Sequence, residues 1–258
     1  MIIACDTHVH CYRFGRLGEL LDNALINFDR YASDATHRVL FFTDGQTDKT
    51  WPRLMELMDG KQAVTMPGGW KVQRGEANGF LSARKDEEMI YLAPARQLNS
   101  AERIEFLVLG CRDNAPDGAT AKHILSEYAH DYVVISPWGV GKWLGERGKI
   151  LSDLIVQKPK DWFLGDNGGR PAIWVGISQC KLAREHGMAI FNGSDPLPID
   201  GELSRIAAYG IRAEIELPEF TLSDLLLSMK LSPQRWHNFG KALGLFRFIK
   251  GRIAMARR

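Results

Sequence analysis

The sequence has 258 residues, of which 45% are hydrophobic and 25% are charged, and its formal net charge is +2. This length and composition suit one large globular domain and exclude a disordered or low-complexity chain. No apolar run approaches the roughly 18 residues of a membrane-spanning helix, and no signal-peptide pattern opens the sequence. The four cysteines have no framework spacing, which predicts free thiols in a reducing cytoplasm; they are Cys5, Cys11, Cys111 and Cys180.

Short apolar runs alternate with amphipathic segments along the chain. The predicted strands are residues 2–6, 39–43, 105–110, 132–136, 162–165, 188–193 and 211–216. The predicted helices are residues 17–31, 51–58, 119–128, 140–156, 174–186 and 221–229. Residues 64–95 differ, because glycines and alternating apolar residues predict a strand followed by an antiparallel excursion. Strands that alternate with helices predict right-handed crossovers and a parallel α/β barrel, in which chemistry gathers at the C-terminal ends of the strands.

The first predicted strand leads directly into His8 and His10. Residues two apart in a strand share a face, so both imidazoles can reach one metal ion. The other five histidines precede strands or fall within helical patterns, where a structural role is the better interpretation; they are His37, His123, His130, His186 and His237. Any further ligands are therefore expected to be carboxylates.

Acidic residues follow several other predicted strands at the same end of the barrel. They are Asp44, Glu76, Asp166 and Asp195. Taken singly, Asp44 and Asp195 are more typical of helix caps than of ligands. Their shared position with the histidine pair makes them candidate ligands or catalytic groups.

These motifs resemble the polymerase and histidinol phosphatase (PHP) family, a group of metal-dependent phosphoesterases with a distorted (β/α)7 barrel. The resemblance follows the family order through Asp6-Thr7-His8-Val9-His10, Phe42-Thr43-Asp44, Gly75-Glu76, Phe106-Leu107-Val108-Leu109-Gly110, Ile135-Ser136-Pro137 and Gly193-Ser194-Asp195. It implies a single barrel domain and one metal held by His8, His10, Glu76 and Asp195.

The sequence also departs from the family pattern. Gly45, Ser136 and Leu197 stand where the family has histidines, and Glu105 stands where a further histidine is usual. The resemblance therefore implies one divalent ion, Zn²⁺, Mn²⁺ or Fe²⁺, rather than a cluster of three. A second ion would have to use Glu76 with Glu105 or Ser136.

Basic and aromatic residues near the strand ends are predicted to bind an anionic substrate. They are Arg74, Trp138, Lys142 and Arg170. Lys142 and Arg170 follow glycine-containing turns, which favour phosphate binding, although a tight strand-to-helix turn explains the glycines equally well. Trp138 lies between Pro137 and Gly139 with little helix face to pack against, so we expect it to contact substrate.

The leading functional hypothesis is a cytoplasmic metal-dependent hydrolase that attacks a small phosphate ester with a metal-bound water. Asp44 or Asp166 would orient the water, and Lys142 and Arg170 would balance charge on the phosphoryl oxygens. An amidohydrolase-type C–N hydrolase ranks lower, because it usually needs two later strand-end histidines. The alternative from another class is a degenerate barrel that binds an anionic ligand or partner without turnover.

Residues 230–258 contain eight Lys or Arg and no acid, which leaves 25 basic against 31 acidic residues in the remainder. This asymmetry favours an anionic partner, such as a membrane surface or, less readily, nucleic acid. A helix docked on the barrel is the simpler interpretation of the same segment. We therefore divide the chain into a barrel over residues 1–232 and a basic helical tail over residues 233–258. The sequence predicts no oligomeric state.

Overall fold

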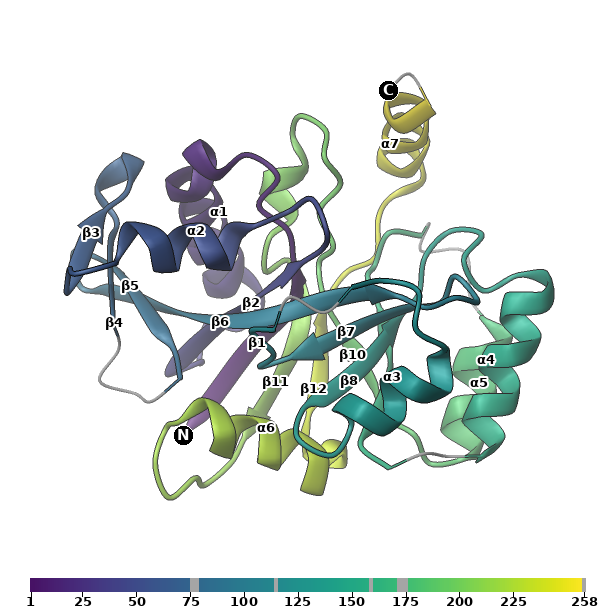
Figure 1. Cartoon of the computed structure of the whole chain (residues 1–258). Coiled ribbons are helices and arrows are strands. Elements are labelled where there is room, and N and C mark those ends of the chain that lie inside the picture. Colours follow the sequence, from purple (N-terminus) through teal and green to yellow (C-terminus); the bar gives the residue numbers. More distant parts are fainter. Residues whose placement is uncertain (75–78, 114–115, 158–159, 171–175, 257–258) are drawn as a thin grey trace.

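The computed structural model describes residues 1–74, 79–113, 116–157, 160–170 and 176–256. Within these ranges the chain forms one mixed α/β domain around a single sheet (Figure 1). The main path of this sheet runs β10-β9-β8-β7-β6-β2-β1-β11-β12 and curves into a nearly closed barrel. The fold is therefore barrel-like, as the sequence predicts, with a more mixed strand order than expected.

The strands are β1 (Ile2–Val9), β2 (His37–Asp44), β3 (Ala63–Thr65), β4 (Lys71–Arg74), β5 (Leu81–Lys85), β6 (Glu88–Asn99), β7 (Glu105–Leu109), β8 (Val133–Pro137), β9 (Trp162–Asp166), β10 (Ile190–Asn192), β11 (Tyr209–Glu214) and β12 (His237–Gly240). The helices are α1 (Leu17–Tyr31), α2 (Thr50–Leu57), α3 (Ala121–Tyr128), α4 (Gly145–Gln157), α5 (Ser178–Glu185), α6 (Leu222–Leu231) and α7 (Leu245–Ala256). A short 3-10 helix, η3, spans Glu202–Arg205.

The sheet is only partly parallel beyond residues 64–95 as well, which corrects the expectation that the remaining strands form a parallel barrel. β1, β2 and β6 run parallel, as do β8, β9 and β10. β7 is antiparallel to both β6 and β8, and β11 is antiparallel to β1. A short connection causes the reversal at β7, because Ser100 N–H donates to the Ile104 carbonyl (2.8 Å) and closes a hairpin. Because β7 runs backwards, its first residue, Glu105, lies at the same end of the barrel as the C-terminal ends of its neighbours.

Side chains of the strands alternate between the inside and the outside of the barrel. Ile3 and Cys5 pack inside, whereas Ala4 between them packs outside against the cluster of α1 and α2. Leu225 and Met229 of α6 join the inside cluster. Figure 1 shows α6 across the end of the barrel where β1 begins, so that end is filled with apolar side chains and the polar site must lie at the other.

Most predicted elements are confirmed. α1 has the predicted bounds, and residues 64–95 form the antiparallel strands β4 and β5 followed by β6, which extends to Asn99. α4 begins five residues later than predicted, because Lys142 N–H donates to the Gly139 carbonyl (3.0 Å) in a turn. His237 was expected in a helix but begins β12, since backbone pairing with Arg212 of β11 outweighs the local helical pattern.

The basic segment is part of the barrel rather than a simple extension. The boundary expected after residue 232 falls just before β12, which pairs with β11, and α7 follows. Figure 1 shows α7 at the end of the barrel opposite α6. Among the described residues, no helix combines the length and the apolarity needed to cross a membrane. All four cysteines are free and buried.

Candidate metal centre

The end of β1 is fixed by the buried carboxylate of Asp6. Its Oδ1 accepts the backbone N–H groups of Ser194 (2.8 Å) and His8 (3.2 Å), and its Oδ2 accepts that of Ala207 (2.8 Å). Burial raises the pKa of Asp6 to about 6, although these hydrogen bonds oppose the shift. The Asp195 N–H also donates to the His8 carbonyl (2.8 Å). β1 and the loop after β10 are thereby held together.

Three potential metal ligands converge at this junction. His8 Nε2 and His10 Nε2 are 3.1 Å apart, and Asp195 Oδ1 lies 3.6 Å from the former and 3.9 Å from the latter. Donor atoms about 2.0–2.2 Å from a tetrahedral ion are separated by roughly 3.3 Å, so the observed spacings fit one ion. Among the described residues, these three form a group in which the ligand atoms all lie within 4.8 Å of one another.

Neighbouring side chains orient two of the three donors. His10 Nδ1 lies 3.2 Å from Asp48 Oδ2, which is the carboxylate–histidine arrangement that orients metal-bound imidazoles. Asn167 Nδ2 donates to Asp195 Oδ2 (2.7 Å) and leaves Oδ1 toward the histidines. His8 Nδ1 is buried and has no hydrogen-bond partner in the part of the chain that the structure describes. His8 is thus positioned mainly by its backbone and by packing.

The three donors differ in how readily they hold a proton. Burial raises the pKa of Asp195, but the charges of His8 and His10 outweigh it and lower that pKa to about 2. Burial lowers the pKa of His8. Burial also lowers the pKa of His10, yet the hydrogen bond with Asp48 and nearby carboxylates raise it above its usual value overall. Asp195 is therefore ionised at neutral pH, and a metal ion would compete with a proton mainly at His10.

A second group of polar residues lies beside the donors, at the ends of β6, β7 and β8. Gln97 Oε1 is 3.3 Å from His8 Nε2, and Gln97 Nε2 donates to Glu105 Oε1 (2.5 Å). Lys142 Nζ donates to the other carboxylate oxygen, Oε2, at 2.5 Å. Burial lowers the pKa of Lys142, but the charge of Glu105 raises it overall. Both oxygens of this carboxylate are therefore already bound by the protein.

Gln97, Glu105 and Lys142 line a cavity of about 310 Å³ together with two of the donors, His10 and Asp195. Its polar floor contains His10, Gln97, Glu105, Lys142 and Asp195, and its apolar walls include Tyr12, Trp138 and Leu197. Tyr12 stacks on His10 with ring centroids 5.1 Å apart. One face of α7 completes the lining with Phe248, Gly251 and Met255. The basic segment therefore covers the candidate metal centre.

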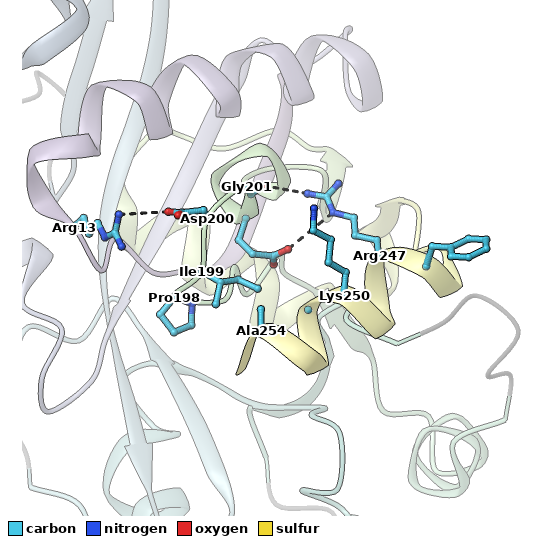
Figure 2. A pocket seen from close by; sticks show the side chains of 11 residues that line it. Arg13, Pro198, Ile199, Asp200, Gly201, Arg247, Lys250 and Ala254 are labelled. Carbon is cyan, nitrogen blue, oxygen red and sulfur yellow. Dashed lines mark hydrogen bonds and ion pairs between the residues drawn. The ribbon is translucent and has the colours of Figure 1, made fainter. Parts of the chain in front are cut away.

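A chain of polar contacts connects α7 with Asp195. Arg247 Nε lies 3.9 Å from Glu202 Oε1, and Glu202 Oε2 pairs with Arg205 Nη1 (3.1 Å). Arg205 Nη2 donates to the Asn167 carbonyl (2.9 Å), and Asn167 in turn binds Asp195. Figure 2 shows Arg247 reaching from α7 to the turn at Gly201. The position of the helix is thus linked to a potential metal ligand.

Asp44, predicted to orient a water, ends β2, and its carboxylate lies against the start of α2. Its two oxygens accept the N–H groups of Thr50 (2.9 Å) and Trp51 (2.7 Å). Burial and the nearby charge of Asp48 raise the pKa of Asp44 to about 6. It does not appear among the residues that line the cavity. Asp44 thus has the cap geometry considered from the sequence, and its catalytic role stays a prediction.

Asp166 and Arg170 bind each other. Arg170 Nη2 lies 2.7 Å from Asp166 Oδ2, which also accepts the Tyr209 hydroxyl (3.2 Å). Asp166 Oδ1 accepts the Gly168 N–H (3.0 Å). Arg170 lines a separate pocket of about 340 Å³ that shares Trp138 with the metal-centre cavity. The predicted roles of Asp166 and Arg170 in catalysis and charge balance therefore require a rearrangement of this pair.

Arg74 lies far from the histidines. It pairs with Leu81, which pairs with Leu92 of β6. Leu92 precedes Gln97 by five residues, which is about 17 Å along a strand at roughly 3.3 Å per residue. The exposed side chain of Arg74 therefore does not contact this cavity in the structure.

The remaining predicted residues have different outcomes. Glu76, the expected fourth ligand, lies outside the described residues. Ser136, considered for a second ion, is fully buried and accepts the indole N–H of Trp162 (3.1 Å). Glu105, its companion in that second site, lines the cavity together with Lys142 and Trp138.

Comparisons with known proteins identify the fold. No family model and no curated protein matches this sequence. The crystal structure of PsfC from Pseudomonas syringae PB-5123 matches with a TM-score of 0.62 and 16% identity, over 98% of this chain and 97% of that one. The lesion-specific endonuclease PfuEndoQ from Pyrococcus furiosus matches with a TM-score of 0.50 and 12% identity, over 89% of this chain and 56% of that one.

This chain therefore spans about half of the endonuclease but nearly all of PsfC. Endonuclease Q is a PHP-family enzyme, so the two likenesses support a PHP-like fold. At these identities they establish the fold alone. The residues of the cavity must carry any argument about function.

Sequence reasoning missed three residues of the site: Asp48, Gln97 and Asn167. Gln97 had a usable signal, because Ala93 and Ala95 of the same strand face the barrel interior and Gln97 continues their alternation. Asp48 and Asn167 lie in loops whose conformation no local pattern predicts. The closure by α7 depends on contacts between residues far apart in the chain, which the sequence does not specify locally.

Proposed function

We propose that this protein is a metal-dependent hydrolase of a small phosphate ester, in which His8, His10 and Asp195 hold one divalent ion. The observation that carries the proposal is the convergence of three matched donors at the ends of β1 and β10. The fold likeness to endonuclease Q, a metal-dependent nuclease, adds support. The substrate of that nuclease is not transferred to this chain.

Two imidazoles and one carboxylate suit Zn²⁺, Mn²⁺ or Fe²⁺. A bound ion of this kind supplies Lewis-acid polarisation and an activated water. Two of the donor side chains are already oriented before an ion binds, because Asp48 orients His10 and Asn167 orients Asp195. Preorganised donors lose little conformational freedom when the ion binds.

Lys142 is the protein cation best placed to contact a phosphoryl oxygen. Its side chain is 42% exposed, lines the cavity and pairs with Glu105. An ammonium group has three donor hydrogens, so it can keep Glu105 and still donate to a substrate. A fixed positive charge at this place would balance the charge of a transferring phosphoryl group.

The cavity favours a compact substrate. Its volume is about 310 Å³, and α7 covers it with Phe248 and Met255. Aromatic side chains of Tyr12 and Trp138 offer flat apolar contact beside the charged floor. A small ester with one anionic group and one apolar or planar part fits this distribution better than a nucleic-acid duplex does.

The proposal is tested by hydrolysis of p-nitrophenyl phosphate and bis(p-nitrophenyl) phosphate after metal removal and reconstitution with each of the three ions. We expect activity with at least one ion, its loss with a chelator, and its loss in the His8→Ala/His10→Ala variant. His186→Ala, at the end of α5, is the matched control and should retain activity. Turnover that is independent of metal would contradict the proposal.

A second candidate is a barrel that binds an anion without turnover. The observation in its favour is the second polar group, where Glu105 is already bound by Gln97 and Lys142. A site of this kind would retain phosphate or sulfate but lack activity with every ion. Isothermal titration with inorganic phosphate, run on wild type and Lys142→Met, separates the two candidates when no turnover is found.

A further inference from the structure

Helix α7 has two apolar faces. Phe248, Gly251 and Met255, at helical spacing, face the metal-centre cavity. Phe246, Ile249 and Ile253 follow a different face and are 90%, 45% and 48% exposed. We call the latter three residues the outer row. Large apolar side chains arranged along one exposed helix face usually mark an interaction surface rather than chance exposure.

The charge around the outer row is strongly basic. Residues 241–258 contain six Lys or Arg and no acid, whereas residues 1–240 contain 27 basic and 31 acidic residues. Lys250 follows Phe246 by one helical turn and lines the pocket beside Gly201, at the flank of the outer row. An apolar row on a helical segment rich in Lys and Arg and free of acids is the pattern of a helix that lies in a membrane interface.

The inner side of α7 is held by the barrel, and this leaves the outer row available. Arg247 Nη2 donates to the Gly201 carbonyl (3.2 Å) and to Ser204 Oγ (2.7 Å). Figure 2 shows the contact of Arg247 with Gly201, and Lys250 and Ala254 line the same pocket. In Figure 1, α7 lies at the opposite end of the barrel from α6. A flat surface can therefore approach the helix without meeting α6.

We propose that the outer row of α7 docks the protein on an anionic lipid bilayer. Phe246, Ile249 and Ile253 would enter the acyl boundary, and the net positive charge of residues 241–258 would favour the anionic surface. A second copy of this chain is a poorer occupant, because it would bring two acid-free basic helices together. The net negative body, with four more acidic than basic residues over 1–240, would be repelled and would turn α7 toward the lipid.

Docking through this face has a consequence for the candidate metal centre. The opposite face of the same helix lines the cavity, so a docked protein would carry that cavity directly behind the lipid-bound helix. The docking proposal does not depend on catalysis, since it uses none of the donor residues. Its failure would leave the proposed hydrolase unaffected.

The test is co-sedimentation with vesicles of phosphatidylcholine alone and of phosphatidylcholine mixed with phosphatidylglycerol. We expect the wild type to bind the mixed vesicles and not the neutral ones, with weaker binding at high salt. The variant Ile249→Asp/Ile253→Asp should bind roughly tenfold more weakly, because both side chains leave the interface. Circular dichroism and metal content should confirm that this variant stays folded.

The matched control is Leu227→Asp/Leu231→Asp on α6, where the two leucines are 50% and 71% exposed. It carries the same charge change at the other end of the barrel and should bind as the wild type does. Equal binding to both vesicle types, no binding, or unchanged binding by the α7 variant would overturn the proposal. Light scattering that detects a dimer lost in the α7 variant would assign the face to a second copy and would also overturn it.

Discussion

Two corners of the candidate site use similar residues in opposite ways. The donor corner, formed by His8, His10 and Asp195, directs nitrogen and oxygen atoms at one point, and no Lys or Arg is hydrogen-bonded to them among the contacts of the described residues. In the ion-pair corner, formed by Gln97, Glu105 and Lys142, the carboxylate is bound on both oxygens.

The difference indicates how many ions the cavity can take. The three donor atoms of the donor corner converge without a protein cation hydrogen-bonded to them, so a metal ion can bind there. In the ion-pair corner, the ammonium of Lys142 already supplies a positive charge to Glu105. We therefore propose that one ion together with Lys142 takes the place of the three-ion cluster that the PHP resemblance implies for intact family members.

The largest effect is expected from breaking the donor corner at its base. Asp6→Ala leaves three buried backbone N–H groups without their acceptor. Each such loss costs about 1–3 kcal/mol, so we expect the free energy of unfolding to fall by about 4 kcal/mol and metal binding to be lost. Urea unfolding measures the first and elemental analysis the second. Asp29→Ala, an exposed acid on α1, is the control; a similar loss there would contradict the assignment.

Asp44, the residue just before the loop that carries Asp48 to the donor corner, should make the free energy of unfolding depend on pH. Burial and Asp48 raise the pKa of Asp44 to about 6 from its ordinary 3.8. Between these values the folded state binds more protons than the unfolded state, so stability falls as pH rises from about 4 to about 6. The contribution is about 3 kcal/mol, at about 1.4 kcal/mol per pKa unit.

Asp44→Asn should remove this part of the pH dependence. Urea unfolding of both proteins at about pH 4, 5, 6 and 7 measures it, and the similar shift of Asp6 cancels because both proteins share it. Two profiles that stay parallel over this range would show that Asp44 does not contribute.

A double-mutant cycle sharpens the account of the ion-pair corner. Lys142→Met leaves Glu105 buried without its cation and should cost about 2 kcal/mol, less than a fully buried pair because the lysine is 42% exposed. Adding Glu105→Gln should recover most of that loss, since neither charge then remains. Thermal or urea unfolding of the four proteins provides the cycle. Additive losses would mean that the pair is not coupled.

The smallest effect is expected where α7 meets the barrel. Arg247→Met removes the hydrogen bonds to Gly201 and Ser204, which lie at the exposed surface. Global stability should change by less than about 1 kcal/mol. Limited proteolysis should nevertheless cleave near α7 faster, because the helix is less firmly held. An unchanged cleavage rate would show that other contacts fix the helix.

Much of the fold could be predicted because its signals are local. Apolar runs of strand length and amphipathic periods located β1, β2 and α1, and the alternation after residue 64 indicated an antiparallel excursion. The reversed direction of β7 was not predicted, since it depends on how the hairpin at Ser100 closes in three dimensions. β12 is also nonlocal, because four residues acquire their structure from pairing with β11.

The site divides in the same way. His8, His10 and Asp195 lie at or just after the C-terminal ends of β1 and β10, so their position was predictable, and the structure brings these three together. The contacts of Asp48 and Asn167 depend on loop conformation. The position of α7 over the cavity depends on contacts between this C-terminal helix and residues far from it in the sequence. Arg170 was predicted to bind substrate because it follows a glycine-containing turn. Its ion pair with Asp166 could not be predicted from the sequence and is seen only in the structure.

The most direct test of the single-ion account is metal stoichiometry by elemental analysis after reconstitution. Wild type and the His186→Ala control are compared with His8→Ala/His10→Ala and with Asp195→Asn, all checked for folding. The account predicts about one ion per chain in the first two proteins, because the described residues contain one three-donor group, and loss of that ion in the two donor-corner variants. Two ions in the wild type, or an ion retained without the histidines, would contradict it.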